Sequence, residues 1–322
     1  MSEKLEDFTL GKQMKPKGSL QKVGIVGCGT MGQEIAIVTS QAGIEVIFVD
    51  ISEARIEEIF KRIGSMLDEV ISKWGMTPNE KKLILSRIKG TTEYSGISDC
   101  EIVLETINTK KPGTSVEIRK EVFRKIEAVV RLDAVILSNT ATLMISDLSS
   151  VLKNPERALG MHFISPVRKV KIAEVVKTFK TSDQAYDCTV KYAKLIGKTV
   201  IDCGESPGNI TTRMIIPIIN EACELLMEGV ATVASIDEAM REAYGLQWGP
   251  FEMADRIGID KMLKWMNNLY EEFGALKYKP SPLIKRMVRA NLAGKRTGEG
   301  FYRYVDGKRL TKPGSIRTLG RI

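Results

Sequence analysis

The sequence is poor in the residues that build metal sites and disulfide scaffolds. Its 322 residues include a single histidine, His162, and five scattered cysteines that form no CxxC pair. One histidine excludes every metal site that needs two, and it confines imidazole acid–base chemistry to one position. The scattered, odd-numbered cysteines argue against zinc and indicate free thiols in a reducing compartment. We therefore expect a cytoplasmic protein without a metal.

Long apolar runs are also missing. No stretch approaches the roughly 20 apolar residues of a membrane span. The first 20 residues contain Glu3, Glu6 and Asp7 and lack the apolar region of a signal peptide. We interpret residues 1–20 as a flexible leader and expect no membrane association.

Positive charge is concentrated near the carboxyl end. The formal net charge is +8, and residues 285–322 hold eleven Lys and Arg against Glu299 and Asp306, so the rest of the chain is nearly neutral. This tail is either a solvated basic surface or a contact for an anionic ligand such as a nucleotide phosphate. Few aromatic residues interleave the charges and no nucleic-acid-binding motif is present, so we expect no nucleic-acid partner.

Apolar runs alternate with helical patterns over the first two thirds of the chain. Runs typical of buried strands lie at 22–26, 45–49, 101–105, 134–137, 158–163, 171–177 and 199–203. The helical stretches between them predict a mostly parallel, doubly wound sheet. Only helical patterns follow the turn signal at 204–208. The sequence thus predicts an α/β domain over residues 21–205 and a smaller all-α domain with a basic tail over 206–322.

A glycine fingerprint follows the first predicted strand, where residues 23–32 read VGIVGCGTMG and fill the G-x-G-x-x-G pattern. The first glycine permits a tight turn, the second lets a pyrophosphate approach, and the third lets the next helix pack closely. The acid that ends the following strand would bind ribose hydroxyls and repel a 2′-phosphate. The residues expected to contact the cofactor are Gly27, Gly29, Thr30, Met31, Gly32 and Asp50. This arrangement predicts a Rossmann-type fold that binds NAD rather than NADP.

His162 stands near the end of a predicted strand, twelve residues before Glu174. Two strands joined by a turn through Pro166 can bring these side chains together. A carboxylate on one imidazole nitrogen would fix the tautomer and leave the other nitrogen free as a base. From these residues alone, a structural histidine and a solvated glutamate are an equally open interpretation.

From Lys22 to about Tyr304 the chain resembles the L-3-hydroxyacyl-CoA dehydrogenase family. The matching segments are KVGIVGCGTMGQEIA at the fingerprint, VLETI at 103–107, LSNTATL at 137–143, HFISPVRKVKIAEVV at 162–176, SPGNITTRMIIPIINEA at 206–222, GPFEMADRIGID at 249–260 and KRTGEGFYRY at 295–304. They occur in the family's order. The last three lie in the predicted helical domain, which a generic nucleotide-binding protein would have no reason to share.

The resemblance implies NAD-dependent oxidation of an L-3-hydroxyacyl-CoA to the 3-ketoacyl-CoA, or the reverse, as in fatty-acid β-oxidation-type metabolism. It also implies a homodimer joined through the C-terminal domain, with acyl-CoA bound between the domains. His162 would be the general base and Glu174 its support. The other residues that the resemblance assigns are Ser138 and Thr212 to catalysis, Asn139, Ser165 and Arg296 to the cofactor, and Lys73 and Thr142 to the substrate.

Several positions depart from the family pattern. The family's catalytic serine is Ala141 here, and the asparagine that helps to hold the substrate oxygen is Thr212. A cofactor-contacting glutamate is replaced by Thr109, the asparagine of the family's HFxNP by Ser165, and the stretch 109–121 is several residues longer. The acid–base pair is retained while the polar groups around it change, which predicts a bulkier or more polar acyl group.

Two other functions stay open from the sequence. One is an NAD-dependent dehydrogenase of a free hydroxy acid or another alcohol, although Lys73 favours a CoA thioester. The second is a non-catalytic NAD-binding protein, against which the retention of His162 with Glu174 argues. The β-hydroxyacid dehydrogenases use a lysine in a GxxGxGxxxK helix, and SPGNITTRMIIP at 206–217 does not match it.

Overall fold

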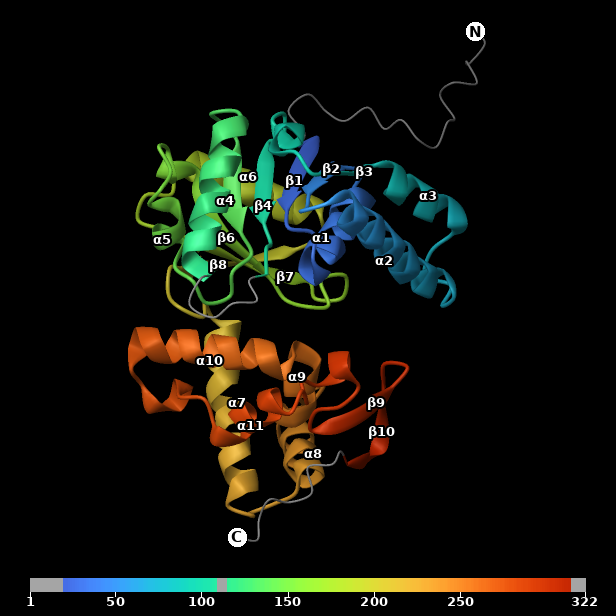
Figure 1. Ribbon diagram of the computed structural model, residues 1–322, viewed down its shortest axis with the longest axis vertical. Coiled ribbons are helices and arrows are strands. Elements are labelled where there is room, and N and C mark those ends of the chain that lie inside the picture. The colour runs from blue at the N-terminus through green and yellow to red at the C-terminus, as the bar shows by residue number, and fades with distance from the viewer. Residues whose placement is uncertain (1–19, 109–114, 314–322) are drawn as a thin grey trace.

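The computed structural model describes residues 20–108 and 115–313, which form two parts stacked one above the other in Figure 1. Three features of the sequence analysis lie outside the described residues. They are the leader up to residue 19, Thr109 with the stretch to residue 114, and the end of the basic tail from residue 314.

An eight-stranded sheet forms the first part, in the order β3-β2-β1-β4-β5-β6-β7-β8. Its strands are β1 (Lys22–Val26), β2 (Glu45–Val49), β3 (Ile88–Thr91), β4 (Ile102–Glu105), β5 (Val135–Ser138), β6 (Ala158–Phe163), β7 (Ile172–Lys177) and β8 (Thr199–Gly204). Neighbouring strands are parallel except β6 and β7. The predicted mostly parallel, doubly wound sheet is confirmed. Strand β3 was not predicted, because only the first of its four residues is buried and the strand lacks a continuous apolar run.

Helices cover both faces of the sheet, because alternate strand residues enter two different cores. On β4, Ile102 and Leu104 enter one core and Val103 enters the other. The first core is covered by α1 (Thr30–Gln41), α2 (Glu53–Ile71), α3 (Pro78–Ser86) and α6 (Asp183–Leu195), and the second by α4 (Ser115–Val129) and α5 (Ile145–Ser149). Short 3-10 turns occur at η2 (Tyr94–Ile97) and η3 (Pro155–Arg157).

Local sequence explains why α2 forms and where it packs. The Ser52 side chain accepts a hydrogen bond from the backbone N–H of Arg55 and so caps the first turn. The buried positions are Ile56, Ile59, Ile63 and Leu67, spaced three and four residues apart. Each buried aliphatic side chain contributes roughly 1.5–3 kcal/mol relative to exposure. Packing of this stripe therefore stabilises the helix far more than its cap does.

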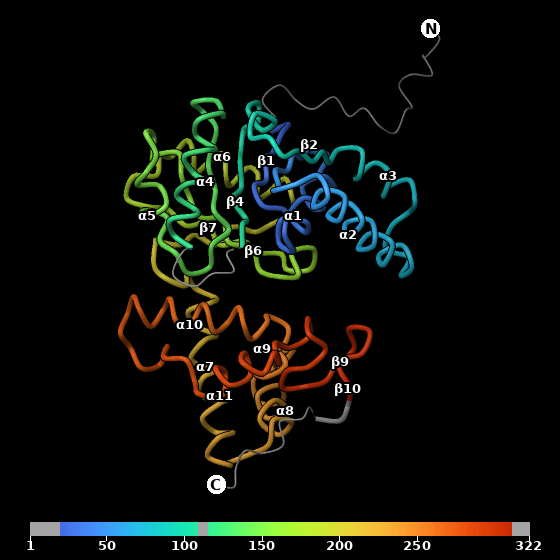
Figure 2. Tube along the Cα trace, in the orientation of Figure 1, coloured from blue at the N-terminus to red at the C-terminus, as the bar shows by residue number. Residues whose placement is uncertain are grey.

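The second part is mainly helical and has a core of its own. Its helices are α7 (Thr211–Met227), α8 (Val233–Tyr244), α9 (Pro250–Ile257), α10 (Ile259–Phe273) and α11 (Pro282–Arg289), with 3-10 turns at η4 (Leu276–Tyr278) and η5 (Lys295–Thr297). The trace in Figure 2 passes from the sheet to this part between β8 and α7. The predicted domain boundary at residues 205 and 206 falls in that passage.

An antiparallel hairpin of β9 (Tyr302–Val305) and β10 (Lys308–Pro313) ends the described chain. Asp306 and Gly307 both have positive φ, 49° and 71°, as a two-residue Asp-Gly hairpin turn requires. Tyr302 and Tyr304 are buried on one side of β9. This hairpin was not predicted, since only helices were expected after residue 208. Its sequence signal is the alternation of buried and exposed residues before an Asp-Gly pair.

Two buried carboxylates hold the hairpin against the helices. Asp255 on α9 accepts hydrogen bonds from the backbone N–H groups of Phe301 and Tyr302, at 2.9 and 2.8 Å, and from the hydroxyl of Tyr304 at 3.1 Å. Asp237 on α8 accepts from the first turn of α9 and from the Tyr302 hydroxyl. Burial outweighs these donors and raises the pKa of both carboxyls, that of Asp255 to about 7.

Among the described residues, no helix has the length and apolar character to cross a membrane, and no three His, Cys, Asp or Glu side chains are grouped to hold a metal ion. All five cysteines are free thiols.

We expect Asp255→Asn to remove part of the pH dependence of stability. Because folding raises the pKa of Asp255 from 3.8 to about 7, its contribution is fully present below about pH 4 and is lost as the pH rises through about 7. Between about pH 5 and about pH 8, the free energy of unfolding of the wild type should therefore fall relative to that of Asp255→Asn. Urea unfolding at several pH values measures this, with exposed Asp306→Asn as the control. Parallel profiles for wild type and Asp255→Asn would contradict it.

Candidate active site

The turn between β1 and α1 has one open and two closed glycine positions. Gly27 has φ +83°, and a Cβ there would lie 2.6 Å from Cγ2 of Ile107. A Cβ on Gly32 would lie 2.9 Å from the carbonyl oxygen of Gly27, whereas one on Gly29 would meet nothing within 4 Å. Only Gly29, at the N-cap of α1, thus leaves space for a group to approach the backbone. The turn fits a dinucleotide whose phosphates lie at the helix N-terminus.

Asp50 lies directly after β2 and beside this turn. Its Oδ2 accepts a hydrogen bond from the backbone N–H of Cys28 and its Oδ1 from that of Ile51, both at 2.9 Å. The carboxylate is half-buried and keeps lone pairs for further donors. Thr30 is exposed and Met31 half-buried at the start of α1, so both border the same space.

His162 and Glu174 face each other on β6 and β7, where they are paired residues of the antiparallel ladder. The imidazole Nδ1 lies 2.7 Å from Oε2 of Glu174. His162 is 6% exposed and Glu174 0%, which excludes the interpretation of Glu174 as a solvated strand residue. The structure therefore brings together the pair that the sequence suggested.

Glu174 also binds the start of α7. Its Oε1 accepts from the backbone N–H groups of Ile210 and Thr211, at 3.2 and 2.8 Å, and its Oε2 accepts from the Thr211 hydroxyl at 3.3 Å. Burial tends to raise the pKa of this carboxyl, but the hydrogen bond and charge of His162 and the bonds from Thr211 outweigh burial and lower it. Glu174 is thus an ionised acceptor that joins the sheet to the helical part.

A buried ion pair occupies the carboxyl end of β4. The carboxylate of Glu105 is 0% exposed and accepts from the Arg119 guanidinium, from the Ser138 hydroxyl at 2.7 Å and from the backbone N–H of Ile107 at 2.7 Å. Arg119 also donates to the carbonyl oxygen of Ile107 at 2.7 Å. The hydroxyl hydrogen of Ser138 is therefore directed to Glu105, and Ser138 stands on the strand end beside Asn139.

Two residues after β5 connect different elements of the site. Asn139 Oδ1 accepts from the backbone N–H of Phe163, the residue after His162, at 2.8 Å. Thr142 Oγ1 accepts from Nδ2 of Asn268 on α10, also at 2.8 Å. Asn139 thus orders the strand end that carries His162, and Thr142 ties this loop to the helical part.

Two of the positions that depart from the family pattern are enclosed, whereas Ser165 is exposed. Ala141 and Thr212 are 8% and 2% exposed. The Ser165 hydroxyl donates to Glu34 on α1 at 3.4 Å, and Glu34 also accepts from the backbone N–H of Val167. Ser165 is thus held against the helix that follows the glycine turn.

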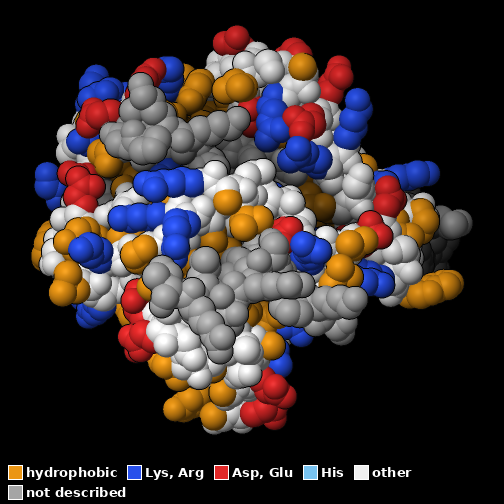
Figure 3. Space-filling view, turned by 60° about the horizontal axis from the view of Figure 1, so that its bottom comes forward, with side chains coloured by type: hydrophobic (Ala, Val, Ile, Leu, Met, Phe, Trp, Pro, Cys, Tyr) orange, Lys and Arg blue, Asp and Glu red, His pale blue; other side chains and the backbone are white. Residues whose placement is uncertain are grey.

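Lys73 and Arg296 lie apart from the His162 pair. Lys73 follows α2 and forms an exposed ion pair with Glu69 at 2.5 Å, and Arg296 on η5 pairs with Asp260 at 2.7 Å. The hydrogen bond and charge of Lys73 lower the pKa of Glu69, with smaller contributions from Arg168 and Lys295. No described contact joins these cations to His162. Figure 3 shows a group of Lys and Arg side chains on the face turned toward the viewer.

Sequence reasoning missed the roles of Glu34, Arg119 and Asn268. Arg119 lies on an amphipathic helix rich in charges, where one arginine carries no signal of burial. Asn268 meets Thr142 across 126 positions of sequence, a contact that no local pattern encodes.

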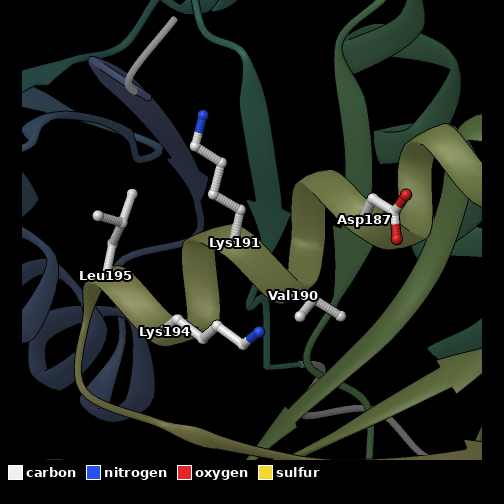
Figure 4. Close-up of a pocket in the computed structure, with 5 residues that line it drawn as sticks. All are labelled: Asp187, Val190, Lys191, Lys194 and Leu195. Carbon is white, nitrogen blue, oxygen red and sulfur yellow. The ribbon is translucent and has the colours of Figure 1, made fainter. Parts of the chain in front are cut away.

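A hollow of about 440 Å³ on the outer surface of α6 is separate from this site (Figure 4). Its lining residues are Asp187, Val190, Lys191, Lys194 and Leu195, all from that one helix. It contains none of the candidate site residues.

Comparison with known proteins covers both parts of the chain. The family model for the NAD binding domain of 3-hydroxyacyl-CoA dehydrogenase matches residues 22–206, and that for its C-terminal domain matches residues 208–304. A 3-hydroxybutyryl-CoA dehydrogenase of Clostridioides difficile is 35% identical over 283 residues, which are 88% of this chain and 99% of the relative.

Solved structures agree with the sequence relatives. The crystal structure of FadB2 from Mycobacterium tuberculosis has a TM-score of 0.85 at 32% identity, covering 89% of this chain and 100% of that one. The (S)-3-hydroxybutyryl-CoA dehydrogenase PaaH1 from Ralstonia eutropha has a TM-score of 0.79 at 38% identity, with coverage of 89% and 100%.

We expect the carboxylate of Asp50 to set a preference for NAD over NADP, since a 2′-phosphate would meet a like charge. Asp50→Asn keeps an acceptor for the Cys28 N–H and removes the charge. The variant should therefore lower the ratio of kcat/KM with NAD to kcat/KM with NADP by about tenfold, or ~1.4 kcal/mol. Steady-state kinetics with both cofactors measures this. Comparable efficiency of the wild type with NAD and NADP would rule the assignment out.

Proposed function

The chain belongs to the 3-hydroxyacyl-CoA dehydrogenase family and is an NAD-dependent enzyme of that activity, and we propose that His162 is its general base. Bound NAD would supply the acceptor for the hydride at C3 of the 3-hydroxyacyl-CoA, and NADH the donor in the reverse direction. The residues that would hold NAD are those of the glycine turn, with Asp50 at the ribose and Asn139, Ser165 and Arg296 toward its other end.

The observation that carries the proposal is the 2.7 Å contact between Nδ1 of His162 and Glu174. Because Nδ1 is engaged by an ionised carboxylate, Nε2 is the nitrogen that removes the proton from the 3-hydroxyl. Glu174 stabilises the imidazolium that forms, and the same nitrogen returns the proton in the reverse direction.

The polar residues around His162 would position the substrate rather than take its proton. Thr212, at the start of α7, stands where the family has an asparagine, so we assign its hydroxyl to holding the 3-oxygen of the substrate. Ser138 acts through Glu105, to which its hydroxyl donates. Thr142 would contact the acyl group, and Lys73, with Arg168 and Lys295 near the same Glu69, would attract the phosphates of CoA.

We expect His162→Gln to lower kcat by ~10²-fold or more, because the chain has no second histidine to act as a base. NADH binding, followed by fluorescence, should change little, since no described contact joins His162 to the glycine turn. Near-normal turnover of (S)-3-hydroxybutyryl-CoA by this variant would make the histidine structural. Glu174→Gln should give an intermediate kcat, and it should also lower the free energy of unfolding by ~1–3 kcal/mol because buried donors of α7 lose a charged acceptor.

We also propose a homodimer formed through the helical part. On the exposed side of α7 and its N-cap, Ile210, Met214 and Ile218 repeat every four residues and are 46%, 65% and 36% exposed. Such a stripe is suited to pairing with its own copy about a two-fold axis.

Met214→Lys should weaken this dimer, since it places a charge at the centre of the stripe. Sedimentation velocity should give about twice the 35.8 kDa chain mass for the wild type and a larger monomer fraction for the variant. A monomeric wild type at micromolar concentration would contradict the dimer, and exposed Lys277→Met serves as a charge-change control.

A reducing cytoplasm and fatty-acid β-oxidation-type metabolism are the setting that we propose. The five free cysteines, four of them buried, support the first, and the family supports the second. Recovery of the active protein in a secreted fraction would contradict this setting.

A further inference from the structure

The turn at residues 165–170 connects β6 to β7, the two strands that carry the acid–base pair. The carbonyl oxygen of Pro166 accepts from the backbone N–H groups of Lys169 and Val170, at 2.9 and 3.0 Å, which folds the turn on itself. In Figures 1 and 2 the yellow-green connection between β6 and β7 lies at the edge of the sheet that is turned toward the helical part. The first residue of the turn, Ser165, is exposed and is among those proposed to hold NAD. The position of this turn therefore matters to the cofactor site.

Lys198 binds the turn with a buried ammonium group. It stands directly before β8 and is only 5% exposed, although a lysine is almost never fully buried unless it is paired. Its Nζ donates to the carbonyl oxygen of Val167 and, at 2.5 Å, to that of Val170. A buried charge is stable only when hydrogen-bond partners surround it. Here both acceptors that the ammonium contacts are main-chain oxygens of the turn, so the charge fixes backbone rather than another side chain.

Glu34 on α1 binds the donors of the same turn. Its carboxylate is 8% exposed and accepts from the backbone N–H of Val167 and, at 3.4 Å, from the hydroxyl of Ser165. Val167 thus donates to a buried carboxylate and accepts from the buried ammonium of Lys198. Charge-assisted hydrogen bonds of this kind are roughly twice as strong as neutral ones. Together these contacts form a clamp on Val167, in which opposite charges hold both polar groups of one residue in the turn.

The clamp on Val167 joins the turn to the cofactor side of the sheet. Glu34 lies on α1, which begins at the glycine turn, and Lys198 leads into β8, which pairs with β7. His162 and Glu174 are held separately, as paired residues of the β6–β7 ladder. Loss of the clamp should therefore displace Ser165 more than it displaces the acid–base pair.

We propose that Lys198 is a positioning residue for NAD, which with Glu34 holds the turn at 165–170 in the arrangement that presents Ser165 to the cofactor. This inference rests on the proposed function, which assigns Ser165 to NAD, and it adds two residues that act through the main chain of the turn. Removing the clamp lowers the fraction of molecules whose turn is in the binding arrangement. The apparent affinity for the cofactor falls by the same factor.

The test is the affinity for NADH, measured by fluorescence titration without substrate, beside steady-state kinetics with (S)-3-hydroxybutyryl-CoA. Lys198→Met removes the charge and both hydrogen bonds and keeps an unbranched side chain. It should raise the Kd for NADH and the KM for NAD about fivefold to tenfold. The value of kcat should change little, because the strand ladder keeps His162 against Glu174. Lys194→Met, at an exposed lysine of α6, is the matched control and should leave all three constants unchanged.

Two further variants separate the hydrogen bonds of the clamp from simple packing. Lys198→Arg keeps a cation that can donate to both carbonyl oxygens, so it should bind NADH more tightly than Lys198→Met. Glu34→Gln keeps an oxygen for the Val167 N–H but loses the charge, so it should raise the Kd for NADH by a smaller factor than Lys198→Met. Equal affinities of the Met and Arg variants would assign the effect to side-chain volume and overturn the inference.

An affinity for NADH in Lys198→Met that equals that of the wild type would also overturn it. The same holds if the Kd, kcat and the KM for the thioester all change in proportion to a loss of folded protein, followed by circular dichroism, since the lysine would then be structural only. A wild type that binds NADH but turns over no 3-hydroxyacyl-CoA would contradict the proposed function, and the NADH affinities would still decide the inference. If Lys198→Met does not fold, Glu34→Gln decides, because an unchanged Kd there would overturn the clamp.

Discussion

Glu174 is a carboxylate with no exposed surface, placed where the last strands of the sheet meet the first helix of the helical part. A buried charge is stable only when donors surround it, and here they come from His162 on β6 and from Ile210 and Thr211 at the start of α7. One group therefore fixes the imidazole tautomer and the position of a helix. The imidazole that we propose as the base and the start of α7 are held by the same carboxylate.

A second link between the parts, from Asn268 to Thr142, lies after β5. With Glu174 at β7 and Thr142 beyond β5, the helical part is attached on both sides of β6, which carries His162. A single neutral hydrogen bond is worth only ~1 kcal/mol, whereas bonds to a buried charge are worth more. The link at Glu174 is thus the stronger one, and motion between the parts would first separate Thr142 from Asn268.

Local signals were enough to predict much of this protein. The strand at 22–26, the glycine turn and the meeting of His162 with Glu174 follow from periodicity, from φ requirements and from a short β-turn-β connection. Arg119 and Asn268 were missed because their roles depend on which helix lies over the sheet edge, and that is settled by packing between distant segments. The β9–β10 hairpin is different, since its Asp-Gly turn was visible in the sequence and was outweighed by the helices before it.

The link from Glu174 to α7 also has a consequence for the order in which the protein becomes active. A ribosome finishes the sheet at Gly204 before it adds Ile210 and Thr211. Until those two residues are in place, Glu174 lacks three of its four described hydrogen-bond donors. His162 is then paired with a carboxylate that α7 does not yet cover. A nascent chain that ends near Gly204 can thus present the glycine turn before the imidazole that we propose as the base is fully oriented. On the proposed mechanism, catalytic competence therefore arrives only with the helical part of the chain.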